Sequence, residues 1–219
     1  MATPARLADA VFDRIRDEIL AGQIKPGSKL SVPALADRLG VSRSPVREAV
    51  QRLTADRLAV DLPRRGCFVI ELSGKELMPV YDVREVLEGL AARRAAEVAD
   101  EGFREALSQH MSEHRKAVAE GDMDRHVVLD LEFHEMIHRS AGNDLLSEAL
   151  SSISDVVQLA TRQSAERRST EEGRGRGEVA IVDHQLICDA LLARDPDAAE
   201  AAARAHVARI RDHWHGAPR

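Results

Sequence analysis

The sequence predicts a mainly α-helical protein with one β-hairpin, divided into two domains. Apolar residues recur at three- and four-residue steps through most of its 219 residues, which is typical of amphipathic helices. An alternating pattern occurs at residues 57–71 and does not recur after residue 75. Positive charge gathers before residue 73: residues 1–72 carry 12 Lys and Arg against 9 Asp and Glu, and the remainder 19 against 28. We therefore expect domains at 1–72 and 73–219.

The composition excludes several classes of protein. Hydrophobic residues make up 44% and charged residues 31%, as in ordinary globular domains. The chain shows no apolar stretch near the roughly 18 residues of a membrane span and no signal-peptide core. Its two cysteines, Cys67 and Cys188, match no metal or redox motif, so we expect a reducing, cytoplasmic location. Cys67 is expected in the hairpin and Cys188 in the helical core.

Residues 35–53, LADRLGVSRSPVREAVQRL, read as two short helices joined by a tight turn, after an amphipathic helix at 7–21. Gly40 stands where a helix ends in a left-handed residue, a conformation that glycine adopts without a Cβ penalty. Ser42 is suited to the N-cap of the second helix, and Pro45 to its first turn. This layout predicts a helix-turn-helix.

The start of the second helix is polar and basic, with Ser42, Arg43, Ser44 and Arg47. In a helix-turn-helix this end of the second helix meets base edges in the DNA major groove. Guanidinium groups suit guanine and phosphate because their forked donors match paired acceptors. An ordinary helical hairpin with a solvated basic face is the alternative that these residues leave open.

Residues 57–71 predict a β-hairpin whose tip is basic, at Pro63-Arg64-Arg65-Gly66. A hairpin directly after a recognition helix is placed to act as a wing that reaches a neighbouring groove or phosphate. A solvated basic turn is the alternative.

The remaining chain predicts a bundle of about six helices. Breaks at glycine, proline and polar runs place these helices at roughly 74–99, 102–119, 122–141, 143–167, 177–193 and 196–213. The glycine-rich segment 169–178 is expected to be a flexible loop.

Four ionisable residues fall inside apolar stripes of three of these helices. At ~100° per residue, Asp130 and His134 lie one turn apart in the middle of the stripe of helix 122–141. His184 and His206 fall among apolar residues of the last two helices. A buried carboxylate needs a cation or several donors, and an Asp with three imidazoles suits Zn²⁺, with Ni²⁺ and Mn²⁺ as alternatives. Hydrogen-bonded core histidines remain the other interpretation.

The other histidines are given no ligand role. His110 and His114 are expected on an exposed helix face, and His126 and His138 are expected to be solvated or to support the site from its edge.

Three motifs of the first 72 residues resemble the GntR-type bacterial regulators: IKPGSKLS at 24–31, residues 35–53, and RRGCFV at 64–69. The resemblance implies a winged helix-turn-helix that contacts DNA through Ser42, Arg43, Ser44, Arg47, Arg64, Arg65 and Gly66. The chain departs from the family at Val32 and Pro33, where an acidic residue and a DNA-contacting arginine are common. The operator is expected to differ accordingly.

The second part resembles the all-helical effector domain of the FadR subgroup, called FCD. The motifs are VYDVREVLEGLAARRAA at 80–96, LDLEFHEMIHRSAGNDLL at 129–146, DHQLICDALLARDPDAA at 183–199, and the later His206. The resemblance implies a metal ion held by Asp130, His134, His184 and His206, and a small carboxylate or sugar acid rather than an acyl-coenzyme A as effector. It implies that Arg84 pairs with the effector carboxylate, unless Arg84 and Glu88 simply form a surface ion pair.

Taken together, these patterns predict a homodimeric transcription regulator, expected to be a repressor. It would bind a two-fold symmetric operator under the control of a small acid at or near the metal. Two alternatives remain: a metal-dependent hydrolase that uses the same Asp and His residues, and a regulator whose metal is purely structural.

Overall fold

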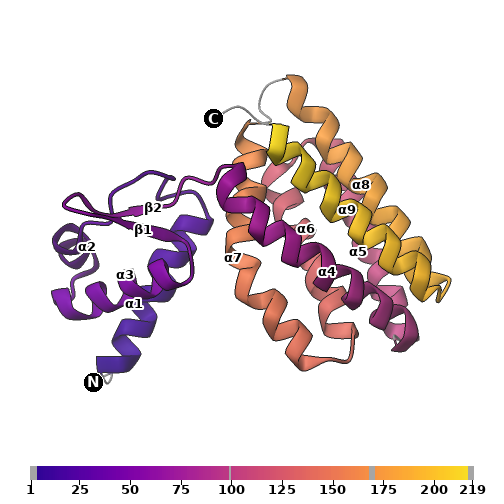
Figure 1. The fold of residues 1–219 in the computed structure, drawn as a ribbon, viewed down its shortest axis with the longest axis horizontal. Coiled ribbons are helices and arrows are strands. Elements are labelled where there is room, and N and C mark those ends of the chain that lie inside the picture. The colour runs from indigo at the N-terminus through magenta and orange to yellow at the C-terminus, as the bar shows by residue number, and fades with distance from the viewer. Residues whose placement is uncertain (1–3, 99, 168–170, 217–219) are drawn as a thin grey trace. The chain divides into compact units, whose positions relative to one another are not determined.

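The computed structural model describes residues 4–98, 100–167 and 171–216 (Figure 1). The described residues form helices α1 to α9 and one two-stranded sheet, which confirms the mainly helical fold with a single hairpin. They divide into two compact units: residues 1–72 with 155–159, and residues 73–154 with 160–219. Each unit is described by itself.

In the first unit, three helices build the predicted helix-turn-helix on a supporting helix. Helix α1 spans Pro4–Leu20, α2 spans Val32–Leu39, and α3 spans Arg43–Ala55. Helix α1 packs against α3 through buried apolar residues such as Ile15 and Ile19. Gly40 ends α2 in the left-handed conformation, with φ of 67°, and its N–H bonds the α2 carbonyls of Ala36 and Asp37. The predicted turn between the two helices is therefore confirmed.

The predicted hairpin follows α3. Strands β1 (Ala59–Leu62) and β2 (Gly66–Val69) pair antiparallel, with Leu62 opposite Gly66. Segment 27–30 pairs with the other edge of β2: the Leu30 N–H donates to the Cys67 carbonyl at 2.9 Å, and Val69 N–H to the Ser28 carbonyl at 2.9 Å. Cys67 lies in β2, as expected. The hairpin is thus tied to the unit along both strands.

The second unit contains the remaining helices, except for residues 155–159 of one of them, which belong to the first unit. They are α4 (Gly74–Val98), α5 (Glu101–Glu120), α6 (Met123–Ser140), α7 (Asp144–Arg167), α8 (Glu171–Leu192) and α9 (Pro196–Gly216). Asp100 and Asp122 cap α5 and α6 by accepting bonds from the N–H groups of Phe103 and Arg125. Gly121 ends α5 in the left-handed conformation. Most predicted boundaries are confirmed within one or two residues.

The loop predicted at 169–178 is wrong over most of its length. Helix α8 begins at Glu171, so the backbone of 171–178 is helical, while residues 168–170 lie outside the described part of the chain. Each glycine in a helix costs about 1 kcal/mol relative to alanine, and this cost is small enough to be outweighed by the continuing helix that follows.

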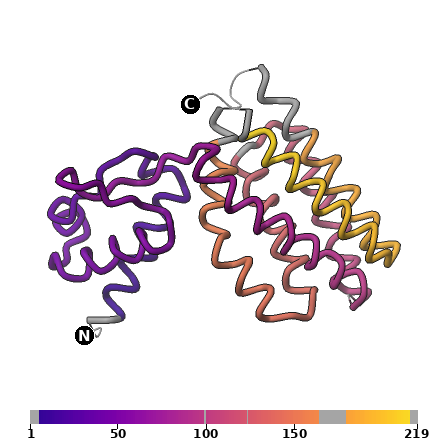
Figure 2. The backbone as a smooth tube through the Cα atoms, viewed as in Figure 1, coloured from indigo at the N-terminus to yellow at the C-terminus, as the bar shows by residue number. Residues whose placement is uncertain are grey.

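Alanines let α4 and α9 approach closely, although these helices stand at opposite ends of the unit's sequence (Figure 2). Ala92 and Ala96 of α4 and Ala199 and Ala203 of α9 belong to the same buried cluster, which also contains Cys188. The Arg211 guanidinium of α9 forms an ion pair with Glu85 of α4 at 2.6 Å, beside the contact between these two helices. No helix in the described part of the chain is long and apolar enough to cross a membrane.

Candidate metal centre and nucleic-acid interface

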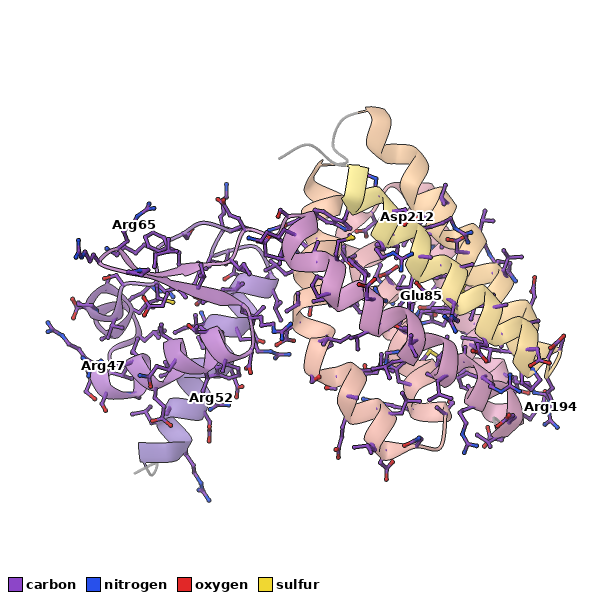
Figure 3. The ribbon with its side chains drawn as sticks, viewed as in Figure 1. Arg47, Arg52, Arg65, Glu85, Arg194 and Asp212 are labelled. Carbon is purple, nitrogen blue, oxygen red and sulfur yellow. The ribbon has the colours of Figure 1, made fainter. Side chains whose placement is uncertain are left out.

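Arg43, Ser44 and Arg47 lie exposed on the first two turns of α3, where Figure 3 labels Arg47. Buried Val46, Ala49 and Val50 hold the opposite face of the helix against the unit's core. Ser42 occupies the N-cap position, but its side chain accepts no hydrogen bond from the helix. The Ser42 hydroxyl and the first N–H groups of α3 are therefore open to another acceptor or donor, such as a phosphate.

The basic tip of the hairpin is also exposed. Arg64 adopts a left-handed backbone, with φ of 64°, and Gly66 follows with φ of 95°, so the turn projects both arginine side chains from the strands. The Arg65 guanidinium lies 5.5 Å from the centre of the Phe68 ring, which steadies it without neutralising its charge. Figure 3 shows Arg65 extending outward from the hairpin and Arg47 extending outward from α3.

The arginines of this unit fall into two groups: those that form ion pairs within the unit, and the candidate DNA-binding arginines. Arg52 bonds Asp9 at 2.6 Å and stacks on Phe12, and Arg38 bonds Glu18 at 2.6 Å. Within the described ranges, Arg43, Arg47 and Arg64 form no ion pair. Their charges are therefore available to phosphates and base edges.

In the second unit, the four predicted ligand residues come together in the interior of the bundle. Asp130 and His134 come from α6, His184 from α8 and His206 from α9, and all four are buried. The ring of His184 stacks on buried Phe133 at 4.2 Å, which fixes its orientation. These residues meet because α6, α8 and α9 each turn an apolar stripe, with one or two polar residues in it, toward a common core.

The distances suit a single ion. Ligand atoms of His134, His184 and His206 lie within 4.8 Å of one another. The Nε2 atoms of His184 and His206 are 3.4 Å apart, close to the ~3.3 Å edge of a tetrahedron with 2.0–2.1 Å metal–nitrogen bonds. The Asp130 carboxylate lies 3.7 Å from His184 Nε2.

Two carboxylates set the tautomers of these histidines. His134 Nδ1 lies 3.2 Å from Glu88, and His206 Nδ1 lies 3.3 Å from Asp183. Because an ionised carboxylate only accepts, each Nδ1 carries the hydrogen and each Nε2 keeps a lone pair for an ion. His134 Nε2 is buried and has no hydrogen-bond partner among the described residues, so the site fits a metal better than a closed hydrogen-bonded core.

The surroundings favour the protonation states that a metal needs. Burial lowers the pKa of His134 and holds the pKa of His184 well below its usual value, so both rings are neutral near pH 7. Burial alone would raise the pKa of Asp130, but the nearby histidines outweigh it and lower that pKa. The site therefore offers the neutral imidazoles of His134 and His184 and an ionised carboxylate.

Arg84 is buried beside this site, so its pairing with Glu88 is not a surface ion pair. The Arg84 Nε donates to Glu88 at 3.0 Å, and both side chains are almost fully buried. Burial alone would lower the pKa of Arg84, but the charges of Glu88, Tyr81 and Asp130 raise it. A guanidinium thus shares the interior with the candidate metal ligands.

The structure also buries polar residues that were expected on the surface. His110 and His114 of α5 lie in the interior, so their predicted exposure is wrong. His126 of α6 is also buried, so the solvated alternative is wrong for it and the supporting alternative stays open. Leu107, His110, Met111 and His114 follow the three- and four-residue steps of a core stripe, and this signal was available in the sequence. His138 is partly buried and donates to Glu88 at 2.9 Å, which fits the supporting role left open for it.

Glu88 and Asp183 are functional candidates that sequence reasoning missed. Glu88 follows Arg84 by one turn on the buried stripe of α4, and Asp183 precedes His184. Asp183 also accepts from the Arg209 Nε at 2.8 Å. Only the tertiary structure shows that these carboxylates face the imidazoles of His134 and His206.

Two family models match the chain. The model described as bacterial regulatory proteins, gntR family, matches residues 7–69, and the FCD domain model matches residues 79–209. Together they span both units.

Curated relatives match over most of their length. The chain is 29% identical to the HTH-type transcriptional repressor RspR of Escherichia coli K12, over 91% of this chain and 85% of RspR. It is 32% identical to a D-xylose utilization operon transcriptional repressor, named as probable, of Paenarthrobacter nicotinovorans. That match covers 94% of this chain and 88% of the relative. It is 28% identical to the gluconate operon transcriptional repressor of Bacillus subtilis 168, and this match covers 83% of this chain and 74% of the relative.

Among solved structures, a transcriptional regulator from Rhodococcus sp. RHA1 described as GntR is similar in fold. Its TM-score is 0.80 at 24% identity, and the match covers 97% of this chain and 99% of that one.

Replacing Arg47 or Arg43 with alanine should weaken operator binding by about 1–3 kcal/mol for each base that the arginine no longer reaches. Arg64→Ala should weaken binding to all sequences more evenly and flatten the salt dependence, since it removes a phosphate partner. Fluorescence anisotropy with operator DNA selected from genomic fragments would measure both effects. Arg14→Ala removes the same charge from α1 and should leave affinity near that of the wild type; equal weakening in all variants would contradict the proposed interface.

The metal-free helical unit should lose stability as the pH falls from about 7 toward 4. Burial lowers the pKa of His114 to about 4, whereas the unfolded residue titrates near 6.5, at about 1.4 kcal/mol per pKa unit. The unfolded chain therefore binds protons across this window that the folded chain does not, so this stability is present above about pH 6.5 and is lost below it.

Urea unfolding followed by the fluorescence of Trp214, the single tryptophan, would measure this dependence. His114→Gln should make it shallower. Unfolding free energies that do not change between pH 7 and pH 4.5 would contradict the buried, neutral state of these histidines.

Proposed function

The chain belongs to the GntR family of bacterial regulatory proteins and is a DNA-binding transcription regulator with an FCD domain; we propose that a small organic acid, bound at or beside a metal ion in that domain, controls its operator affinity. The observation that carries this proposal is the buried cluster of His134, His184 and His206, with Asp130 3.7 Å from His184 Nε2 and the Arg84 guanidinium buried beside them. Relatives named as repressors support repression as the output.

Zn²⁺ is the ion that this donor set fits best, with Ni²⁺ or Mn²⁺ as alternatives. When bound, the ion supplies positive charge and open positions for water or a ligand oxygen. His134 and His206 are held for it by Glu88 and Asp183, and Asp130 provides the one carboxylate of the set.

A carboxylate on the effector suits the Arg84 side chain. The Arg84 fork already bonds Glu88, and Glu88 in turn bonds His134, so one buried chain of contacts joins the candidate effector group to a candidate metal ligand. An acid that draws Arg84 away from Glu88 would alter the bond that orients His134. A relative is named for a gluconate operon, which favours sugar acids among the small carboxylates to be tested.

A homodimer on a two-fold operator belongs to the same proposal, together with a cytoplasmic location. Helix α8 exposes Val179, Val182 and Leu186 at helical spacing, and α4 exposes Val83, Val86 and Leu90. Such apolar stripes are typical of association surfaces. A ligand then acts only if it binds one arrangement of the dimer more tightly than another.

The hydrolase alternative is not pursued, since the family and its named relatives are regulators. A purely structural metal remains the competing proposal. It predicts destabilisation on chelation with no effect of any acid on DNA binding.

His134→Gln should remove the tightly bound metal and abolish any effect of acid on operator binding, while the metal-free DNA affinity stays within a few-fold of the wild type. Metal content would be measured by mass spectrometry on untagged protein purified without chelator, beside the double variant Asp130→Ala/His134→Ala. DNA affinity would be titrated with D-gluconate and with malonate. Wild-type protein that binds metal but responds to neither acid, nor to a wider panel of small carboxylates, would favour the structural metal.

Arg84→Lys should keep the metal and its stoichiometry but weaken the effect of the acid at least tenfold, because a lysine keeps the charge and loses the forked donors. Arg94→Lys, on the exposed side of the same helix, is the matched control. An unchanged acid response in Arg84→Lys would remove Arg84 from the effector site.

A further inference from the structure

We propose that the bundle holds a second metal ion beside the first, bound by His114, His126 and Asp130, with the Asp130 carboxylate shared between the two ions. This inference rests on the proposed function, because Asp130 is also a candidate ligand of the first ion. It assigns a role to two histidines that the first site does not use.

The three residues meet the geometric requirements of a metal site. One ligand atom from each lies within 4.8 Å of the others, and the side chains are buried, with 0% exposure for His114, 1% for His126 and 9% for Asp130. His114 Nε2 lies 2.9 Å from His126 Nδ1. Two nitrogens bound at right angles on one ion at 2.0–2.1 Å would be about 2.9 Å apart.

The helix that carries these ligands places the two sites next to each other. His126, Asp130 and His134 follow one another at four-residue steps on α6, so Asp130 stands between two chelating pairs on one face. The His184 ring lies 5.5 Å from the His114 ring and 5.2 Å from the His134 ring. A carboxylate has two oxygens and commonly bridges paired ions about 3.5–4 Å apart.

A hydrogen-bonded histidine pair is the competing explanation of the 2.9 Å contact. That explanation leaves one buried polar atom without a hydrogen bond, because His114 Nδ1 has no hydrogen-bond partner among the described residues. In a neutral imidazole pair one ring donates the shared hydrogen, and when that hydrogen moves to the other nitrogen of the same ring, the lone pairs of His114 Nε2 and His126 Nδ1 are both directed at the same space. The pair also lies against Asp130, the carboxylate that two ions would need.

The third group of adjacent ligand types, Glu88, His134 and His138, is a weaker candidate. The carboxylate of Glu88 already accepts from Arg84, His134 and His138, so its lone pairs and its charge are engaged. The second ion is therefore assigned to His114 and His126.

Charge sets the order of binding. Two divalent ions exceed the single negative charge of Asp130, so the second ion should bind more weakly than the first unless hydroxide or an acid anion adds negative charge. An acid that bridges both ions would link this site to control by the effector.

The test is the stoichiometry of Co²⁺ and Zn²⁺ on metal-free full-length protein, measured by mass spectrometry after gel filtration and by titration calorimetry. Wild type should bind two equivalents, the second more weakly. His114→Gln and His126→Gln should bind one, and His206→Gln should lose the tight equivalent. His110→Gln changes a neighbouring buried histidine outside the set, whose Nε2 lies 2.8 Å from the Leu129 carbonyl, and should still bind two.

Mn²⁺ gives an independent measurement. Two ions that share the Asp130 carboxylate should show an exchange-coupled electron paramagnetic resonance spectrum in the wild type, and His126→Gln should give the spectrum of an isolated ion. Trp214 fluorescence would verify that each variant is folded, and the wild-type spectrum does not depend on the variants folding.

One equivalent in the wild type, retained in His114→Gln and His126→Gln and absent in His206→Gln, would overturn the second site and leave the first in place. No bound metal after reconstitution would overturn both the second site and the metal dependence in the proposed function.

Discussion

The carboxylate of Asp130 lies in the interior of a helical bundle, and much of the second unit is arranged around that charge. An isolated ionised carboxylate in an apolar interior is strongly unfavourable, so it must be met by donors or a cation. Imidazoles from α5, α6, α8 and α9 surround it, and Glu88 and Asp183 hold the outer nitrogens of two of them. The small residues of α4 and α9 allow the helices to approach closely enough for these side chains to meet.

The pairing of charges also organises the first unit, but here some of the arginines are left without an acidic partner in the described chain. Arg38 and Arg52 are neutralised by acidic partners and hold the helices together, whereas Arg43, Arg47 and Arg64 project from α3 and the hairpin tip without ion pairs in the described chain. The protein as a whole is acidic, with a net charge of −6, yet residues 1–72 carry 12 Lys and Arg against 9 Asp and Glu. The distribution of charge, and not its sum, is what favours DNA.

Glu88 connects Arg84, the candidate effector-binding residue, to His134, a candidate metal ligand. It accepts from Arg84 on one oxygen and from His134 and His138 on the other. A change in what Arg84 binds therefore bears on the orientation of an imidazole that faces the candidate ion. Under the proposed function, metal and acid meet in a single set of buried polar contacts, where the low dielectric strengthens each contact.

The sequence by itself determined the helix-turn-helix, the hairpin and the stripe positions of Asp130, His134, His184 and His206, because turn chemistry and helical periodicity are local properties. It misjudged His110 and His114, since a polar residue in a core stripe looks like an exposed one until its neighbours are known. It also misjudged residues 171–178, where helix propensity opposed the outcome. Only the tertiary structure decided that Glu88 and Asp183 face imidazoles and that Arg84 is buried, because those contacts join helices far apart in the chain.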